Sequence, residues 1–521
     1  MILVVLALVI IIYQATKAFL DPLKAIPGPF WARFTRAWYL RKVWHGDFEK
    51  TNIALHEKYG THPVDTAPQA DCCGPIVRIA PGQYSLKDPE SLKTIYGHGT
   101  SFTKGPWYAA SGSADPNTHD LFTDRDAKRH GDNRKKVARL YSMTSLLDYE
   151  HHVTELTKKM VAKFKDLASV GSDSDLGIDM QHWLQCFAFD MIGLITVGAP
   201  FGYIDRPEDS HTMFSALHAY LFYSANVGVY AEFHSFLSRF TALVNGSGMS
   251  YMLGFTQTQI AKHETHNEKA PAASQVNTST STDFLTKLLQ IKQEQPRKIS
   301  DEDVFGACLT NIGAGSDTTS ISLSGILYWL IINPRAHQRL TFASFHVQLQ
   351  KELDEKAAKG EISSPITFLE AQSLPYLQAC IKEGLRLHPA TGLPLSRVVP
   401  KGGATLCKWF VPEGTIVGVN TWVMHRNKVV FGDDADDFVP ERWLEDPERA
   451  SHMDRFFMTF GLGSRTCIGK NISLMEISKL VPELIRYFDF RLAKPNEKLE
   501  TQNVWFVKQK NFRCVVSLRK E

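Results

Sequence analysis

The sequence predicts a protein that is mainly α with small β-sheets (α+β), and its length allows two to four domains. The 521 residues are 44% hydrophobic and 22% charged, which is enough apolar sequence to bury a sizeable core. Helical patterns dominate the chain, and strand signals occur in only two places, at residues 76–82 and 404–420. The 58 Lys+Arg residues nearly balance the 55 Asp+Glu residues, so the charge excess of a nucleic-acid-binding protein is absent.

Residues 1–20 are predicted to be a transmembrane anchor. Ile2 to Ile12 is an unbroken apolar run that continues with few polar residues to Leu20, about 19 residues against the roughly 20 that a span requires. No basic residue precedes the run and no small-x-small cleavage site follows it, which favours an uncleaved anchor over a signal peptide. A buried core helix is the alternative, but the run lacks a polar face.

The segment after the anchor, residues 21–45, is predicted to be a basic, proline-containing hinge. Pro27, Gly28 and Pro29 stop any helix and set a turn before the globular body, residues 46–521. The positive-inside rule places this body in the cytosol, because basic residues follow the anchor with only Asp21 opposing them. They are Lys17, Lys24, Arg33, Arg36, Arg41 and Lys42.

Two strand regions and one connector interrupt the helical pattern. Residues 76–82 alternate in polarity and end on Pro81-Gly82, and residues 404–420 hold short apolar runs around Pro412-Glu413-Gly414. Residues 270–282 are rich in Ser, Thr, Asn and Gln and are predicted to be an exposed connector.

One long helix is predicted between Ser300, an N-cap followed by acidic residues, and the stop signal Asn333-Pro334. It spans roughly 33 residues, or about 50 Å. Its centre, residues 313–319, holds two glycines and two threonines, a composition that predicts a local irregularity. Close packing at small residues is the alternative reading, although a buried Asp317 and Thr318 would then need partners.

The Gly-rich segment 460–469 leads directly into an amphipathic helix whose apolar residues recur at steps of three and four. Cys467 lies just before that helix and two residues after Arg465, a positive environment that favours the thiolate, which is a nucleophile or a metal ligand. A lone cysteine in a large chain is more often an inert core residue. Here, however, the glycines leave room for a flat, bulky group.

This segment, Phe460-Gly461-Leu462-Gly463-Ser464-Arg465-Thr466-Cys467-Ile468-Gly469, matches every fixed position of the F-x-x-G-x-R-x-C-x-G signature. With it the chain resembles the haem-thiolate monooxygenases of the cytochrome P450 family. Three further motifs of the family occur in the expected order: Gly315-x-Asp317-Thr318-Thr319, Glu383-x-x-Arg386 and Phe438-Val439-Pro440-Glu441-Arg442. The resemblance extends from the anchor to the C-terminus and implies the cytochrome P450 fold, a single haem-thiolate domain.

The resemblance implies haem b as the cofactor and assigns each site residue a role. Cys467 would be the proximal iron ligand, and Asp317 and Thr318 would deliver protons on the opposite side of the haem. The residues implied to bind haem, four of them through its propionates, are His130, Arg134, Arg397, Arg465, Phe460, Gly463 and Gly469. Glu383, Arg386 and Arg442 would form a buried ion network beneath the cysteine loop.

The implied function is insertion of one oxygen atom of O2 into an apolar small molecule. Electrons would come from NADPH through a separate flavoprotein, an NADPH-cytochrome reductase, because the chain has no flavin or nicotinamide motif of its own. The implied location is the endoplasmic-reticulum membrane, and similarity to the pisatin-demethylase-like group of fungal enzymes implies secondary-metabolite biosynthesis. The alternatives are a haem-thiolate isomerase or peroxide-driven hydroxylase, and a non-catalytic haem-binding protein.

Two stretches depart from the family pattern. Residues 61–73 and residues 341–349 look inserted, and both are predicted to loop out of the fold without touching a named motif. The substrate is not specified by the sequence. Aromatic residues between Phe214 and Phe240 are candidates for the roof of an apolar substrate cavity, and residues 102–122 and 391–395 for its walls.

Overall fold

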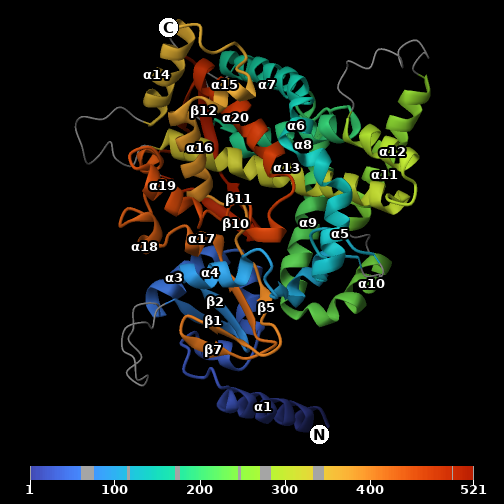
Figure 1. Ribbon diagram of the computed structural model, residues 1–521, viewed down its shortest axis with the longest axis vertical. Coiled ribbons are helices and arrows are strands. Elements are labelled where there is room, and N and C mark those ends of the chain that lie inside the picture. Colours follow the sequence, from blue (N-terminus) through green and yellow to red (C-terminus); the bar gives the residue numbers. More distant parts are fainter. Residues whose placement is uncertain are drawn as a thin grey trace.

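The computed structural model describes residues 2–59, 75–113, 118–170, 177–244, 248–269, 283–332, 345–495 and 497–519. Within these ranges it is a helix-rich body with small sheets, as the sequence predicts (Figure 1). The α-helices are α1 (Ile2–Leu20), α2 (Ala37–His45), α3 (Phe48–Tyr59), α4 (Pro89–Tyr96), α5 (Ala127–Val137), α6 (Met143–Leu147), α7 (Glu150–Val170), α8 (Met180–Val197), α9 (His211–Val227), α10 (His234–Val244), α11 (Gly248–Lys269), α12 (Phe284–Glu294), α13 (Asp301–Ile331), α14 (Phe345–Ala358), α15 (Phe368–Gln372), α16 (Pro375–Leu387), α17 (Thr421–Met424), α18 (Lys428–Phe431), α19 (Pro447–Asp454) and α20 (Lys470–Tyr487).

The largest sheet joins both predicted strand regions. Its strand order is β1-β2-β8-β5-β3, and only the β2–β8 pair is parallel. The strands are β1 (Ile76–Ala80), β2 (Gln83–Leu86), β3 (Thr103–Lys104), β5 (Arg397–Val398) and β8 (Ile416–Val419). The short pair β6 (Ala404–Leu406) and β7 (Trp409–Val411) precedes β8, so the predicted strand signals at 76–82 and 404–420 are confirmed.

Two small sheets come from the C-terminal part of the chain. One is the hairpin β10 (Glu500–Val504) and β11 (Phe506–Lys510), which packs against α13. The other orders β4 (Ile178–Asp179), β12 (Arg513–Leu518) and β9 (Phe488–Leu492), with β12 in the centre. The C-terminal strands thus lie among the helices, where β11 contacts α13 and β12 contacts α7 (Figure 1).

The long predicted helix is α13, which crosses the middle of the molecule (Figure 1). It begins at a capping box in which Ser300 and Asp303 satisfy each other's backbone N–H groups. The predicted irregularity at residues 313–319 is not found, because the helix continues through them. A Cβ at Gly315 would lie 2.8 Å from Ile192 Cδ1, so this glycine serves the close packing of α13 on α8.

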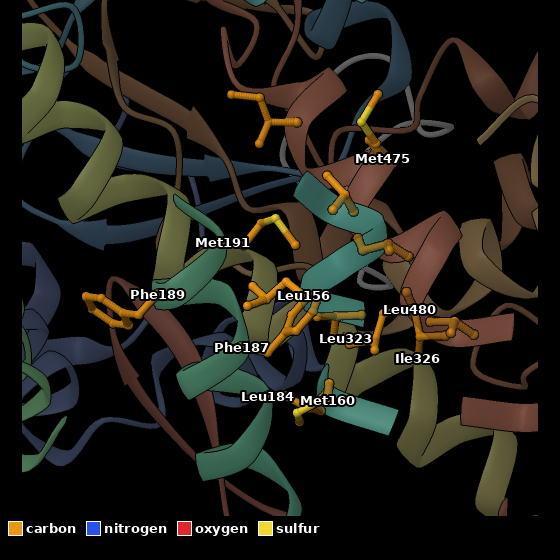
Figure 2. Close-up of a cluster of buried hydrophobic side chains, with 14 of the residues drawn as sticks. Leu156, Met160, Leu184, Phe187, Phe189, Met191, Leu323, Ile326, Met475 and Leu480 are labelled. Carbon is orange, nitrogen blue, oxygen red and sulfur yellow. The ribbon is translucent and has the colours of Figure 1, made fainter. Parts of the chain in front are cut away.

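The main core surrounds α13. Apolar side chains from α7, α8, α13, α16 and α20 are fully buried there and hold the central helix between its neighbours. Figure 2 shows ten labelled members of this cluster: Leu156, Met160, Leu184, Phe187, Phe189, Met191, Leu323, Ile326, Met475 and Leu480. The consequence for the site is that α13 and α20 are rigidly placed relative to each other.

The N-terminal helix α1 lies at the edge of the molecule, apart from the body (Figure 1). Val9, Ile12, Tyr13, Phe19 and Leu20 on it are exposed. Judged by length and hydropathy, no helix among the described residues qualifies as a membrane span.

One of the two apparent insertions is partly described, and there the prediction is wrong. Residues 345–349 form the first turn of α14 instead of looping out. Leu349 is fully buried, and Gln348 Oε1 accepts a hydrogen bond of 3.0 Å from the Tyr376 hydroxyl. The helix therefore uses these residues for packing against α16. Residues 341–344, the whole 61–73 stretch, the 270–282 connector and the stop signal Asn333-Pro334 lie outside the described residues.

Candidate functional site

The predicted cysteine loop is held in one conformation by its own backbone. Cys467 N–H donates to the Phe460 carbonyl over 2.7 Å, and α20 begins three residues later with Gly469 as its N-cap. Gly463 has a φ of +61°, and a Cβ there would fall 2.0 Å from the Tyr96 carbonyl oxygen. Only glycine fits this position. Gly463 therefore sets how closely the loop approaches α4.

The Cys467 thiol is reachable by solvent although protein surrounds it. Burial raises its pKa, while the backbone N–H groups of Gly469 and Lys470 and the charge of Arg134 oppose that rise. The predicted influence of Arg465 on the thiol is wrong, because its guanidinium turns away to donate to the Asp124 and Asp126 carbonyls. The protein alone thus favours the thiol here, and a bound metal cation is what would stabilise the thiolate.

Part of the surface of helix α13, which packs on the helix that follows Cys467, is accessible to solvent. Ala314 is exposed and Thr318 half-exposed, although Ser316 and Asp317 between them are buried. The Thr318 hydroxyl donates to the Ala314 carbonyl over 2.7 Å. The neighbouring Thr319 hydroxyl is 2.8 Å from that of Ser473 on α20, which ties α13 to the helix that follows Cys467. The small residues predicted at the centre of α13 thus leave an accessible surface beside the cysteine loop.

Five basic side chains act on one another near the cysteine loop, and we call them the cation cluster: Lys104, His130, Arg134, Arg397 and Arg465. Of these, Arg134 also acts on the Cys467 thiol. Lys104 and Arg397 face each other across the β3–β5 pair. Burial first, then the charges of Arg465, Lys104 and Arg134, lower the pKa of His130 to about 4. Burial, then Arg397 and Arg465, hold the pKa of Lys104 well below its ordinary value. Like charges therefore crowd together around one point.

Protein carboxylates offset the charge of the cation cluster only in part. Among the described residues none of its members forms a salt bridge. The charges of Asp120 and Asp124 act on Lys104, but Asp124 is engaged in a bidentate contact to Arg129, 2.8 and 2.9 Å. Partly buried cations without paired counter-charges are costly, so the site calls for an anionic partner. A planar group with two carboxylates fits, with an iron ion beside the soft sulfur ligand Cys467. The residues present therefore fit haem b.

Lys104 belongs to this cluster but was not singled out in the sequence. Its ammonium donates to the Phe122 carbonyl and lies 4.6 Å and 5.0 Å from the centres of the Tyr108 and Phe122 rings. A lysine in an aromatic segment does not by itself predict a binding role. Its position in the cation cluster follows from the β3–β5 register, which places it opposite Arg397.

Asp317 is buried, and its carboxylate forms a hydrogen bond with Gln185. Gln185 Nε2 on α8 donates to Asp317 Oδ1, and Lys508 Nζ on β11 donates to Gln185 Oε1 over 2.5 Å. Burial raises the pKa of Asp317, and the charges of Lys508 and His218 and the Gln185 hydrogen bond oppose the rise. Neither Gln185 nor Lys508 could be predicted as a partner of Asp317, because both are remote from it along the chain.

The predicted ion network is confirmed and fully buried. The Glu383 carboxylate accepts two hydrogen bonds from the Arg386 guanidinium, at 2.8 and 2.9 Å, and one from Arg442 Nε, at 2.9 Å. Val439 N–H and Trp443 Nε1 complete five bonds to one carboxylate. Burial alone would raise the pKa of Glu383, but the two guanidinium groups lower it.

The network reaches the cysteine loop through His425. Arg386 donates to the His425 carbonyl over 2.6 Å, and the His425 ring joins the Arg386 carbonyl to Met458 N–H, each over 2.8 Å. Thr459 adds a bond of 3.1 Å to the carbonyl of Leu385. The buried charges thus anchor the residues immediately before Phe460.

A cleft opens between the large sheet, α2 and the 3₁₀ segment η6 (Gly228–Phe233). Its lining includes Trp107, Leu393, Pro394 and Ser396, and the last of these is adjacent to Arg397 of the cation cluster. The Arg36 guanidinium spans one side, where it pairs with Glu232 and donates to the Val229 carbonyl over 3.0 Å. The cleft therefore lies beside the segment that leads into β5.

Comparison with known proteins identifies relatives over almost the whole chain. Residues 56–515 match the family model described as Cytochrome P450. Pisatin demethylase of Fusarium vanettenii is 37% identical over 495 residues, which cover 94% of this chain and 88% of the relative. The cytochrome P450 monooxygenase cicH of Emericella nidulans is 32% identical over 496 residues, covering 94% and 93%. The monooxygenase hepC of Aspergillus oryzae is 31% identical over 511 residues, covering 94% and 91%.

Proposed function

The chain belongs to the cytochrome P450 family and is a haem-thiolate monooxygenase, and from that premise we propose how its residues act and where it works. The observation that carries the proposal is the exposed Cys467 near a cation cluster whose members lower each other's pKa. When bound, haem b supplies the iron at which dioxygen is reduced and its O–O bond is cleaved. The chain's own residues hold the cofactor, exclude water and deliver protons.

Cofactor binding is assigned to two groups of residues. Cys467 is the proximal ligand, and Phe460, Gly463 and Gly469 fix the loop that carries it. His130, Arg134, Arg397 and Arg465, joined by Lys104, bind the two propionates. A neutral His130 still donates one hydrogen bond, so the low pKa of its imidazole is compatible with this role.

Proton delivery is assigned to Asp317 and Thr318. The Thr318 hydroxyl is held at the accessible face of α13 by its bond to the Ala314 carbonyl. Its oxygen can then accept a further hydrogen bond and pass on a proton at the reaction site. Asp317 is adjacent, buried and inclined toward the protonated state by its burial, which suits a proton donor.

We expect Thr318→Ala to bind haem and substrate normally but to uncouple, so that NADPH oxidation yields peroxide in place of product. General acid catalysis contributes about 10²- to 10⁴-fold, so product formation per NADPH falls by at least that lower bound in Asp317→Asn. Peroxide release and product yield per NADPH measure this. Thr310→Ala is the matched control, because Thr310 makes the same type of bond to the Gly306 carbonyl two turns away. Unchanged coupling in both site variants would remove the pair from the mechanism.

Two alternatives are distinguished by the same residues. A haem-thiolate isomerase or a peroxide-driven hydroxylase needs no proton donor for dioxygen and would tolerate Asp317→Asn and Thr318→Ala. A non-catalytic haem-binding protein would keep Cys467 and yet turn over no substrate with any electron donor. The presence of Thr318 on the accessible side of α13, next to the buried Asp317, favours dioxygen activation with electrons from NADPH through a separate flavoprotein reductase.

The cleft beside η6 is the proposed entrance for an apolar small molecule. Its lining includes the apolar residues Trp107 and Leu393, and Trp107 stacks on Trp505 with ring centres 4.2 Å apart. Of the aromatic residues expected to roof the cavity, Tyr220 packs inward through its bond to the Ser111 carbonyl. Phe233, Phe236 and Phe240 are exposed and are not part of a roof. The names of the relatives support a role in fungal secondary-metabolite biosynthesis.

We assign membrane attachment at the endoplasmic reticulum to residues 1–20, a single-pass anchor, with residues 21–45 as hinge and residues 46–521 as the cytosolic catalytic domain. The apolar run of residues 2–12 and the basic residues after it support this orientation. The exposed Phe30 and Trp31 in the hinge suit the membrane–water interface.

We expect the full chain to stay in the membrane pellet after extraction at alkaline pH and the variant lacking residues 2–20 to lose this property while keeping its haem spectrum. The deletion removes about 19 mostly apolar residues, close to the roughly 20 that a span requires. Release of the full chain by the same extraction would contradict a spanning anchor and favour a helix lying at the interface.

A further inference from the structure

A continuous hydrogen-bonded line connects the C-terminal hairpin with Asp317. Lys508 Nζ donates to Gln185 Oε1 over 2.5 Å, and Gln185 Nε2 donates to Asp317 Oδ1. Gln185 and Asp317 are only 1% and 5% exposed, so water does not compete for the bond between them. The three residues come from β11, α8 and α13, which meet only in the folded protein.

The order of donors and acceptors in this line is fixed. An ammonium can only donate and an ionised carboxylate can only accept, so the amide between them satisfies both in one orientation alone. In the flipped amide, NH2 would face the ammonium and the carbonyl oxygen would face the carboxylate, and both contacts would repel. Lys508 therefore locks the Gln185 amide in the orientation that favours the charged form of Asp317.

Lys508 is held at this place by the strand that carries it. The next residue, Gln509, points to the opposite face of β11 and donates to the Ile321 carbonyl of α13 over 2.9 Å. Ile321 follows Asp317 by one helical turn, so the strand and the carboxylate are tied to the same part of α13. The ammonium also lies 5.7 Å from the centre of the Phe214 ring, which limits its freedom.

Few other charges act on the carboxylate. Among the described residues they are Lys508 from β11 and His218 from α9; α8 contributes the neutral Gln185, and α11, α16 and α20, which also pack on α13, contribute none. Burial lowers the pKa of His218, and the charge of Lys508 lowers it further, whereas the charge of Asp317 raises it. Of the two groups, Lys508 opposes the cost of burying the Asp317 carboxylate more strongly than His218 does.

We propose that Lys508, acting through Gln185, is the positioning residue that fixes the orientation of the Asp317 carboxylate and stabilises its charge between proton transfers. The proposal rests on the proposed role of Asp317 as proton donor. It assigns the hairpin β10–β11 a part in setting the pH range over which protons are delivered, beyond its packing role. Gln185 transfers no proton. Its amide is held in one orientation by Lys508 and in turn orients the Asp317 carboxylate.

The direct test is an infrared titration of the carboxyl group in the purified holoenzyme. Subtracting the spectrum of Asp317→Asn isolates the band of protonated Asp317, and its intensity is followed against pH. Loss of a neighbouring cation favours protonation, so in Lys508→Met the band should persist to a pH about one unit higher, a roughly tenfold change in proton affinity. Lys508→Arg should restore the titration of the natural protein.

Lys510→Met is the matched control, because Lys510 is an exposed lysine on the same face of the same strand. It should titrate like the natural protein. Gln185→Glu replaces the donating amide by a second carboxylate, which must share a proton with Asp317 and should raise the pH of half-protonation as well. It carries the test if Lys508→Met does not fold.

Three results would overturn the proposal: an unchanged titration in Lys508→Met, an equal shift in Lys510→Met, or an unchanged titration in Gln185→Glu. The yield of peroxide per NADPH against pH provides the catalytic counterpart and should shift in the same direction in Lys508→Met. The infrared band reports the network whether or not turnover occurs. Failure of the network thus stays distinguishable from failure of Asp317 as a proton donor, which Asp317→Asn reports.

Discussion

Replacing Cys467 by alanine is expected to abolish the red-shifted Soret band that thiolate-ligated haem gives when the reduced protein binds carbon monoxide. The band depends on sulfur donating charge to iron, and the described residues around Cys467 offer no second thiol: the other described cysteines lie elsewhere in the fold, four of them buried in the body. The carbon-monoxide difference spectrum and the haem content of the purified protein measure the effect, which should be complete.

Cys407→Ala provides the control for this experiment. Cys407 lies between β6 and β7, where its sulfur contacts the Ser91 hydroxyl at 3.5 Å, far along the chain from the loop that carries Cys467. This variant should keep the full band. A normal band in Cys467→Ala would show that another group binds the iron and would contradict the assignment of Cys467 as its ligand.

Neutralising Glu383 is expected to have the largest effect on folding. Glu383→Gln leaves the Arg386 and Arg442 guanidinium groups buried without their shared counter-charge, and breaking such a network costs about 3–5 kcal/mol. Because Arg386 supports His425, and His425 holds the Met458 backbone, the cysteine loop should loosen as well. Thermal unfolding and haem retention measure both consequences.

Glu445→Gln is the matched control, since Glu445 is exposed two residues after Trp443, which contacts Glu383. Its stability should change little. The pH dependence has a definite sign: the pKa of folded Glu383 lies below its ordinary value, so its stabilising contribution is present above that value and is lost as pH falls through the folded pKa. An acid-unfolding midpoint unchanged in Glu383→Gln would contradict this assignment.

Much of the site could be predicted because short motifs carry it. Phe460 to Gly469 form one local loop, and its glycines, its cysteine and the helix that follows are contiguous in the sequence. Ser300 and the acidic residues after it predicted the start of α13 for the same reason, since a capping box is a local interaction. Structures that depend on hydrogen bonds between residues close in the chain can be predicted from short sequence motifs.

The residues that escaped prediction are those placed by tertiary contacts. Lys104 joins the cation cluster through the pairing of β3 with β5, and Gln185 and Lys508 reach Asp317 from elements more than a hundred residues away. The expected irregularity in α13 failed for a related reason. Packing of α13 on α8 at Gly315 outweighs the weak helix propensity of its centre, and hydroxyl groups such as that of Thr318 bond back to the helix.

The 341–349 stretch shows the limit of comparison by pattern. Its length relative to family members suggested a loop, yet Leu349 is buried and Gln348 bonds to Tyr376. An added segment can be absorbed by a helix when its apolar residues meet an existing core.

The central claim is that this chain inserts one atom of dioxygen into an apolar molecule, and oxygen labelling tests it most directly. Deleting the gene in its host and comparing extracted metabolites identifies the precursor that accumulates. That precursor is then incubated with the holoenzyme, a flavoprotein reductase, NADPH and catalase under ¹⁸O2. We predict a product that carries one labelled oxygen atom from the gas. A product without label, or one formed only when peroxide is supplied, would contradict the monooxygenase assignment and favour the isomerase or the peroxide-driven hydroxylase.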